Sequence, residues 1–168
     1  MLGVDHPETL ASRHERARWK GLNGDADYAA REMAQLLRAR QRVLGPNHPD
    51  SLITQHEAAT WRIEKGDVEG GMADLELVIG LRTKCLGPDS PDTLNSRLTL
   101  ATMQASIDGS EEAVDALALV VRDIDRALGQ GHPTRIKAHN TLKEFRKALG
   151  ETKHHWRHHS DGQSSKCK

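Results

Sequence analysis

Apolar residues in this chain recur at the spacing of one face of an α-helix. Leu75, Val78 and Ile79 stand at positions i, i+3 and i+4, with mainly polar residues on either side. The same spacing starts at Met33 and again at Leu117. A stripe with this period of about 3.6 residues predicts an amphipathic helix with one buried face. The chain therefore has three predicted helices of closely similar pattern.

These stripes belong to a longer repeat of 42 residues. A phrase of Leu-Gly, followed by His-Pro or Ser-Pro, opens each copy; it begins at Leu2, Leu44, Leu86 and Leu128. Self-similarity at periods of about 20 to 50 residues is typical of stacked supersecondary units. We predict an all-α fold, a solenoid of helical hairpins with three helix pairs and one C-terminal capping helix. The repeats span residues 2–43, 44–85 and 86–127, and the capping helix lies within 128–149.

Residues that start and end helices divide each repeat into two. In the second copy, Gly45 predicts a left-handed residue after the preceding helix, and Pro49 suits the first position of the next one. We expect this first helix over 49–64 and a second from the N-cap Asp67 to about residue 85. The histidine before the proline is interpreted as a helix-start residue rather than as a metal or catalytic ligand. It recurs as His6, His48 and His132, and the third copy has Ser90 as its N-cap.

Two further repeated positions predict how the helices pack. Small residues recur twelve positions apart where two paired helices must approach closely, for example Ala59 and Gly71. A bulky residue recurs on each first helix, and we expect it to fill the seam between successive helices. The alternative is an aromatic ladder that stacks on a ligand. The bulky residues are Trp19, Trp61, Met103 and Phe145.

The two ends of the array are predicted to differ. In the fourth copy, Lys143 and Lys147 replace small or apolar residues of the earlier copies, so helix 133–149 should turn that face to water. Terminal repeats of stacked arrays carry such a polar outer face. The first helix has no preceding pair and should expose apolar surface. We expect a partner, a second copy or an upstream domain to cover it.

Residues 150–168 leave the repeat pattern, and their composition predicts a disordered tail. Four histidines in it could bind a metal such as zinc, because imidazole suits that ion. The alternative is a solvated tail whose affinity for metals is incidental. The four residues are His154, His155, His158 and His159.

Charge, cysteines and missing motifs narrow the function classes. Lys plus Arg and Asp plus Glu number 24 each, so the net charge indicates neither a nucleic-acid nor a membrane partner. The sequence shows no membrane-spanning segment or secretory signal, and two cysteines without a C-x-x-C pattern suit a reducing cytoplasm. It also lacks a phosphate-cradling loop, an H-E-x-x-H pair and a G-x-S-x-G elbow. We therefore predict neither catalysis nor a cofactor.

The small residues at touching positions, the Gly-Asp between paired helices and the phrase L-G-x-x-H-P-[DE]-[TS]-L resemble tetratricopeptide repeats. The 42-residue form is similar to the kinesin-light-chain type, which is frequent in bacterial, especially actinobacterial, proteins. The resemblance implies a superhelix whose concave surface is lined by first helices. In the family an Asn-Asn pair on that surface helps to hold a peptide, and here only Asn140 keeps the pattern. The residues that the resemblance places on the groove are His14, Arg18, His56, Thr60, Asn95, Thr102, Lys137, Asn140 and Glu144.

The resemblance implies a cytoplasmic, non-enzymatic scaffold or adaptor that binds a protein or peptide segment in this groove. Two alternatives stay open. The chain is a fragment or remnant of a larger bacterial nucleotide-switch regulatory protein, or it is a metal-responsive binder through its His-rich tail.

Overall fold

The computed structural model describes the backbone of residues 3–161 and the side chains of residues 3–150. These residues form seven helices and no strand, which confirms the predicted all-α class. They fall into two compact units, Met1–Pro88 and Asp89–Lys168, and each is described by itself.

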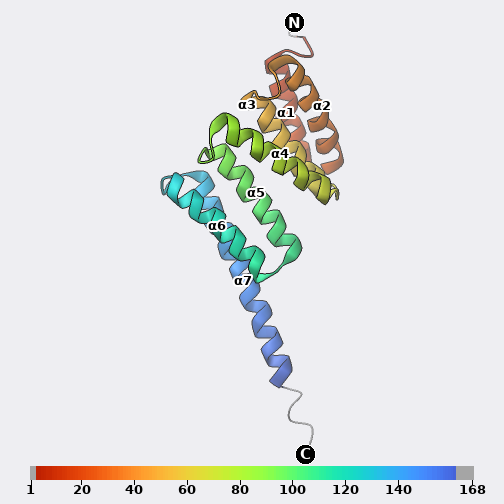
Figure 1. Ribbon diagram of the computed structural model, residues 1–168. Helices are drawn as coiled ribbons and strands as arrows, with labels where there is room; N and C mark the ends of the chain where they lie inside the picture. Colours follow the sequence, from red (N-terminus) through yellow and green to blue (C-terminus); the bar gives the residue numbers. More distant parts are fainter. Residues whose placement is uncertain (1–2, 162–168) are drawn as a thin grey trace, which may run out of the picture. The chain divides into compact units, whose positions relative to one another are not determined.

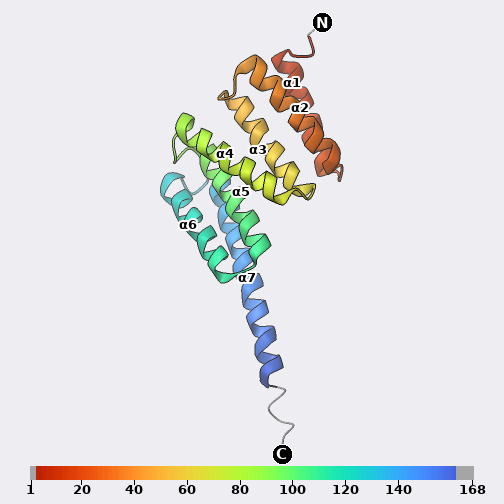
Figure 2. The same cartoon turned by 45° about the vertical axis from the view of Figure 1, so that its right-hand side comes forward.

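Unit 1 consists of two helix pairs (Figures 1 and 2). Helix α1 (Pro7–Leu22) pairs with α2 (Ala26–Leu44), and α3 (Pro49–Glu64) pairs with α4 (Val68–Leu86). Helix α2 also contacts α3, so each helix packs on its neighbour in the sequence. The bounds of α3 are those predicted, and α4 ends within one residue of its predicted end.

Unit 2 contains one helix pair and the capping helix. Helix α5 (Pro91–Asp108) pairs with α6 (Glu111–Ala127), and α7 (Pro133–Asp161) contacts both. Ala138 and Leu142 of α7 are buried in the core of the unit, and Phe145 packs against it. Lys143 and Lys147 are exposed, as predicted for the outer face of a terminal helix.

Helix α7 runs beyond residue 149, where the sequence placed the end of the capping helix and the start of a disordered tail. Its backbone is helical to Asp161. Residues 150–161 contain no proline, the residue that opposes helix continuation most strongly. Residues 162–168 and the side chains beyond 150 lie outside the described part.

The helix starts explain the repeated His-Pro phrase. The Nδ1 atoms of His6, His48 and His132 each accept a hydrogen bond of 3.2 Å from the backbone N–H two residues further on. Each ring thus satisfies one of the unpaired donors of a helix N-terminus, and the following proline has no N–H to satisfy. Their interpretation as helix-start residues is confirmed. Ser90 holds the same position before α5, but its hydroxyl makes no capping hydrogen bond.

The second helix of each pair begins at an N-cap residue, and α2 is followed by a glycine with positive φ. Asp67 caps α4 by accepting from the N–H of Gly70 at 3.1 Å, and Ser110 caps α6 by accepting from Ala113 at 3.1 Å. Gly45 follows α2 with φ of 96° and ψ of 157°. This conformation has the predicted positive φ, but its ψ is extended, a combination that essentially only glycine adopts.

Close approach of the paired helices α3 and α4 depends on the absence of a side chain at Gly71. A Cβ built there would meet the Ile63 side chain and would stand 2.7 Å from the Ala59 carbonyl oxygen. No real Cβ tolerates such distances without movement of the backbone. The small residues predicted at the touching positions of this pair are therefore confirmed.

The bulky residue of the first helices has two different environments in unit 1. The ring of Trp61 on α3 lies on Gly21 of α1, where a Cβ would meet its ring atoms, and it packs against the core of the unit. Trp61 therefore fills a seam, as predicted. The same prediction is wrong for Trp19, which is 70% exposed. The seam needs the helix pair before the bulky residue, and α1 is the first helix of the described chain.

Candidate functional site

In unit 1, the residues predicted to bind a partner lie on α1 and α3 but differ in exposure. Arg18 is exposed, His56 and Thr60 are half-buried, and His14 is buried with 5% of its surface accessible. The Thr60 hydroxyl donates to the carbonyl oxygen of His56 within the helix at 2.7 Å. His14 is therefore much less accessible to a partner than the other three residues.

His14 belongs to a buried polar network that joins α1, α2 and α3. The guanidinium of Arg40 enters from α2, donates to Thr54 Oγ1 at 2.6 Å and to the Asp50 carbonyl at 3.1 Å, and lies 3.4 Å from His14 Nδ1. On the other side of the ring, His14 Nε2 lies 3.4 Å from a carboxylate oxygen of Glu57. Three helices are thus tied through one arginine side chain.

The two ring nitrogens of His14 face different partners. Nδ1 lies 3.4 Å from the Arg40 guanidinium and 3.5 Å from Thr54 Oγ1, and the Thr54 hydroxyl donates to the Asp50 carbonyl at 2.8 Å. Nε2 lies on the side of the Glu57 carboxylate.

Two charged groups of the network have shifted pKa values. Burial would raise the pKa of Glu57, but the His14 N–H and the nearby charge of Arg18 outweigh burial and hold this pKa below its usual range. Burial lowers the pKa of Arg40, against the raising effect of the Asp50 and Glu57 carboxylates. Glu57 therefore stays ionised at neutral pH, and Arg18 Nε lies 3.8 Å from its second oxygen. The surface of α1 and α3 thus presents a carboxylate beside a cation.

The sequence reasoning missed the arginine that builds this network. A signal was present, because Arg40 and Arg82 occupy the same position of successive repeats, 42 residues apart. Both are buried, and Arg82 donates to the carbonyl oxygen of Leu52 at 3.3 Å. A basic residue recurring among apolar positions of a second helix indicates a buried guanidinium with backbone acceptors.

In unit 2, three predicted residues gather on one face of α7. Lys137, Asn140 and Glu144 line a hollow of about 480 Å³, and Ile136 beside them is 51% exposed. All three polar side chains are exposed and follow one another at helical spacing. The hollow combines an apolar surface, an amide and both signs of charge.

The two predicted residues on α5 are less accessible. Asn95 and Thr102 are half-buried, and the Thr102 hydroxyl donates to the Leu98 carbonyl at 2.7 Å. Their side chains can contribute edges of a binding surface rather than its main contacts.

The exposed face of α1 is a separate feature of unit 1. Trp19 and Leu22 are 70% and 69% exposed, and Trp19 shares a hollow of about 410 Å³ with Glu15, Arg16 and Lys20. An accessible tryptophan beside an accessible leucine is an apolar patch that usually marks a contact surface. The structure thus exposes apolar groups at the end of the array where the sequence predicted them.

Two further features concern the described residues, namely metal sites and membrane-spanning helices. Among the described side chains, no group of three or more His, Cys, Asp or Glu is arranged to hold a metal ion. The side chains of His154, His155, His158 and His159 lie outside that part of the chain. No helix formed by the described residues has the length and apolar character that crossing a membrane requires.

Comparisons with known proteins agree with this geometry. The profile of the family described as Tetratricopeptide repeat matches residues 9–50. Two solved structures of a kinesin-light-chain-like protein of Podosopora anserina, made of nearly identical TPR-like repeats, are similar over 92% of this chain and 73% of theirs. One is 32% identical with a TM-score of 0.64, and a point variant of the same protein is 30% identical with a TM-score of 0.67. No curated protein sequence matched the chain.

Proposed function

Because the chain belongs to the tetratricopeptide-repeat family, in its kinesin-light-chain-like type, we propose that it binds a protein or peptide segment on the surface of its first helices. Tetratricopeptide repeats generally mediate protein–protein interaction and typically act as non-enzymatic scaffolds. A cytoplasmic location and a role as adaptor belong to the same proposal. Since fold alone does not specify function, the proposal depends on the residues of that surface.

The observation that carries the proposal is the hollow on α7. Asn140 offers an amide that can pair with both the N–H and the carbonyl of a peptide backbone, which is the usual requirement for sequence-tolerant peptide binding. Lys137 and Glu144 flank it by one turn on either side, and Ile136 offers an apolar contact. In unit 1, Arg18 and the ionised Glu57 supply a second pair of charges.

Buried groups have a supporting role in this proposal. His14 lies too deep to touch a partner, but its Nε2 lies 3.4 Å from one carboxylate oxygen of Glu57, whose other oxygen faces Arg18. A binding side chain held by packing and hydrogen bonds loses less conformational entropy when a partner arrives. We expect His14 to affect affinity through Glu57 alone.

An affinity capture with the full chain tests the proposal. Wild type, Asn140→Ala and Arg18→Ala are immobilised at equal density, exposed to native cytosol, and compared by quantitative mass spectrometry. We expect a partner recovered by wild type and reduced about tenfold by each variant, a loss typical of an interface hot spot. Both sites are exposed, so each variant should melt within about 2 °C of wild type. Partners retained equally by both variants would refute the assignment of the surface.

We further propose that the exposed face of α1 is covered in the functional assembly, by a second copy, an upstream domain or another partner. The support is the exposed pair of Trp19 and Leu22. Hydrogen exchange over residues 7–22 tests this at low protein concentration, where a dimer dissociates. Rapid exchange is expected for the uncovered helix, because local openings are frequent where few apolar contacts are buried. Strong protection in a dilute monomer would contradict it.

A further inference from the structure

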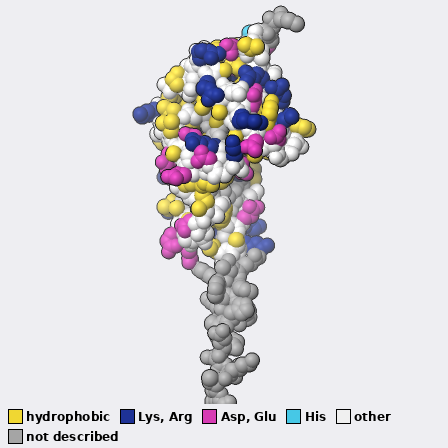
Figure 3. Space-filling model, turned by 90° about the vertical axis from the view of Figure 1, so that its right-hand side faces the viewer, with side chains coloured by type: hydrophobic (Ala, Val, Ile, Leu, Met, Phe, Trp, Pro, Cys, Tyr) yellow, Lys and Arg dark blue, Asp and Glu magenta, His cyan; other side chains and the backbone are white. Residues whose placement is uncertain are grey.

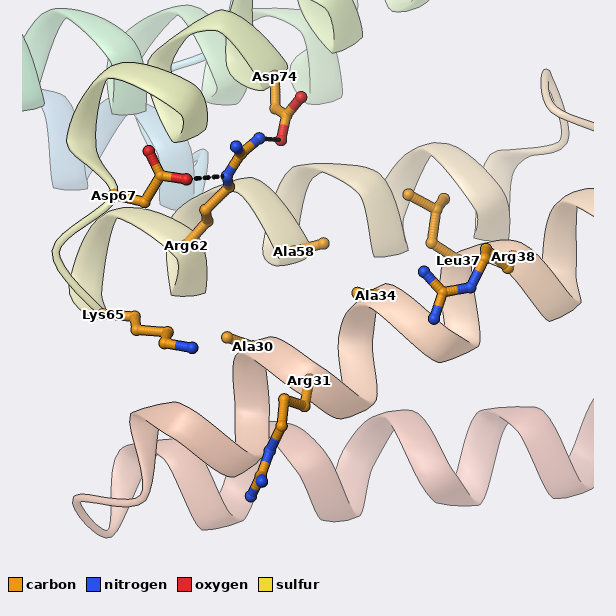
Figure 4. Close-up of a pocket in the computed structure, with 10 residues that line it drawn as sticks. All are labelled: Ala30, Arg31, Ala34, Leu37, Arg38, Ala58, Arg62, Lys65, Asp67 and Asp74. Carbon is orange, nitrogen blue, oxygen red and sulfur yellow. Dashed lines mark hydrogen bonds and ion pairs between the residues drawn. The ribbon is translucent and has the colours of Figure 1, made fainter.

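Another hollow of unit 1 lies among α2, the C-terminal half of α3 and the start of α4 (Figure 4). Its volume is about 500 Å³, within the range of about 300–1,000 Å³ typical of ligand sites. Ala30, Ala34 and Leu37 of α2 and Ala58 of α3 form its apolar floor. None of the residues predicted for the first-helix surface lines it.

The hollow exists because two repeat positions carry alanine. The position of Ala58 is occupied by Leu100 and Leu142 in the following repeats, and the position of Ala30 by Met72 and Val114. In each case the alanine side chain is shorter by two or more carbon atoms than the side chain at the same position of the following repeats. The space that those larger side chains occupy is therefore open here. The opening is therefore a feature of this repeat and not of the repeat architecture.

The rim of the hollow is positively charged. Four basic and two acidic side chains line it, which leaves a formal charge of +2. Arg62 is neutralised by Asp74 at 2.8 Å and by Asp67, so it contributes little attraction for an anion. Its pKa is raised by the hydrogen bonds to Asp74 and Asp67. The uncompensated charge comes from the other basic residues.

Three cations of the rim remain available to a partner. Arg31 and Arg38 are exposed and form no ion pair with described residues, and Lys65 pairs only with the exposed Asp27 at 3.3 Å. Figure 4 shows Lys65 beside Ala30 at one end of the hollow and Arg38 beside Leu37 at the other, with Ala34 and Ala58 between them. The face in Figure 3 shows Lys and Arg side chains interspersed with acidic and apolar ones.

The shape of the floor indicates the form of the occupant. Its α2 members stand at positions i, i+4 and i+7, so the apolar strip runs along the helix for about 10 Å at 1.5 Å per residue. A partner helix laid alongside would place its own i, i+4 and i+7 side chains on that strip. Carboxylates on its flanks would meet the cations of the rim.

We propose that this hollow is a second docking site, which takes an acidic amphipathic helix with aliphatic anchors. The apolar anchors fill the space left by Ala30 and Ala58, and the carboxylates pair with Arg31, Arg38 and Lys65. The site is independent of the first-helix surface and can be occupied at the same time.

Two labelled synthetic peptides of 15 residues serve as probes. Both carry Leu at i, i+4 and i+7 on an Ala-rich helix; one has Glu at the flanking positions and the other has Lys. Fluorescence anisotropy measures binding to the full chain in 50 mM and 150 mM salt. We expect the Glu peptide to bind with a Kd below about 100 μM, the Lys peptide to bind at least about tenfold more weakly, and salt to weaken the former.

Four variants locate the binding. Ala58→Leu fills the hollow with the residue of the sister repeats, and Arg38→Glu reverses one rim charge; each should weaken the Glu peptide about tenfold or more. Arg122→Glu makes the same change at the corresponding position of the third repeat and should change Kd less than about twofold. Arg18→Ala lies on the first-helix surface and should have no effect. Arg38→Glu preserves the test if Ala58→Leu disturbs folding.

Four results would overturn the proposal. The first three are a Kd for the Glu peptide above about 100 μM, equal binding by wild type and both hollow variants, and an equal loss in Arg122→Glu. Binding lost in Arg18→Ala but kept in Ala58→Leu would also overturn it, because the peptide would then occupy the first-helix surface.

Discussion

Two glycines on α4 predict opposite effects of one substitution on stability. Gly71 lies in the contact with α3, where a Cβ would stand 2.7 Å from the Ala59 carbonyl oxygen and 3.1 Å from the Ile63 backbone nitrogen. Gly80 lies on the exposed side of the same helix, and a Cβ there would have no atom within 4 Å. Comparing them separates helix propensity from packing within one helix.

The magnitudes follow from these two environments. Replacing glycine by alanine inside a helix normally raises the free energy of unfolding by about 1 kcal/mol. Gly80→Ala should gain this amount, and a chain of this size should then melt about 2–4 °C higher. At Gly71 the new methyl group meets backbone atoms that cannot rotate away, and overpacking of this kind costs about 1–3 kcal/mol. We expect the upper part of that range, about 2–3 kcal/mol. The gain in helix propensity of about 1 kcal/mol offsets part of it, so Gly71→Ala should lower the free energy of unfolding by about 1–2 kcal/mol and melt about 3–6 °C lower.

Thermal melts followed by circular dichroism at 222 nm measure both variants against wild type. Because stacked repeats can unfold in more than one step, the midpoint of the transition that shifts is compared rather than a single global value. Opposite signs are expected. If both variants shifted upward by similar amounts, the close approach of α3 and α4 would be incorrect.

Three further comparisons test other contacts. Trp61→Ala should lower the free energy of unfolding by about 2–4 kcal/mol because the Trp61 ring packs on the core of unit 1. Trp19 is exposed, so Trp19→Ala should change this free energy by less than about 0.5 kcal/mol. Equal losses of both variants in urea titrations would contradict the packing of Trp61 in a seam. Arg40→Ala should cost about 2–4 kcal/mol by leaving buried acceptors unpaired, whereas loss of the surface pair in Arg42→Ala should cost under about 1 kcal/mol in the same titrations. Hydrogen bonds from two arginines hold the pKa of Asp123 below its usual range, so its stabilising effect is full above about pH 4 and disappears as pH falls through the lower folded value. The stability difference between wild type and Asp123→Asn should therefore shrink on acidification, and growth of that difference would refute the assignment.

The sequence predicted most helix boundaries, and the reason is local. His48, Pro49 and Asp67 act on the backbone within a few residues of themselves, so their effect does not depend on distant packing. The end of α7 was predicted less well, because no proline or strong C-cap marks where the repeat pattern stops. Helix continuation there depends on propensity alone, which is a weaker signal.

The burial of single side chains and their contacts with other helices were harder to predict than the positions of the helices. Trp19 and Trp61 occupy the same repeat position, but among the described residues a helix pair precedes Trp61 and none precedes Trp19. His14 was placed on the surface by analogy, and the structure buries it because Arg40 reaches across from α2. The hollow at Ala58 also required the structure, because a deviation from the repeat becomes a site only when the neighbouring helices are known to leave it open.

The contrast between exposed Trp19 on α1 and the lysine-bearing outer face of α7 has a consequence for lengthening the protein. An engineered duplicate of residues 2–43 joined ahead of α1 would offer Trp19 a copy of Gly21, the residue on which the Trp61 ring lies. The same duplicate joined after α7 would have to desolvate Lys143 and Lys147. Tandem arrays built from this unit should therefore grow in one direction along the chain.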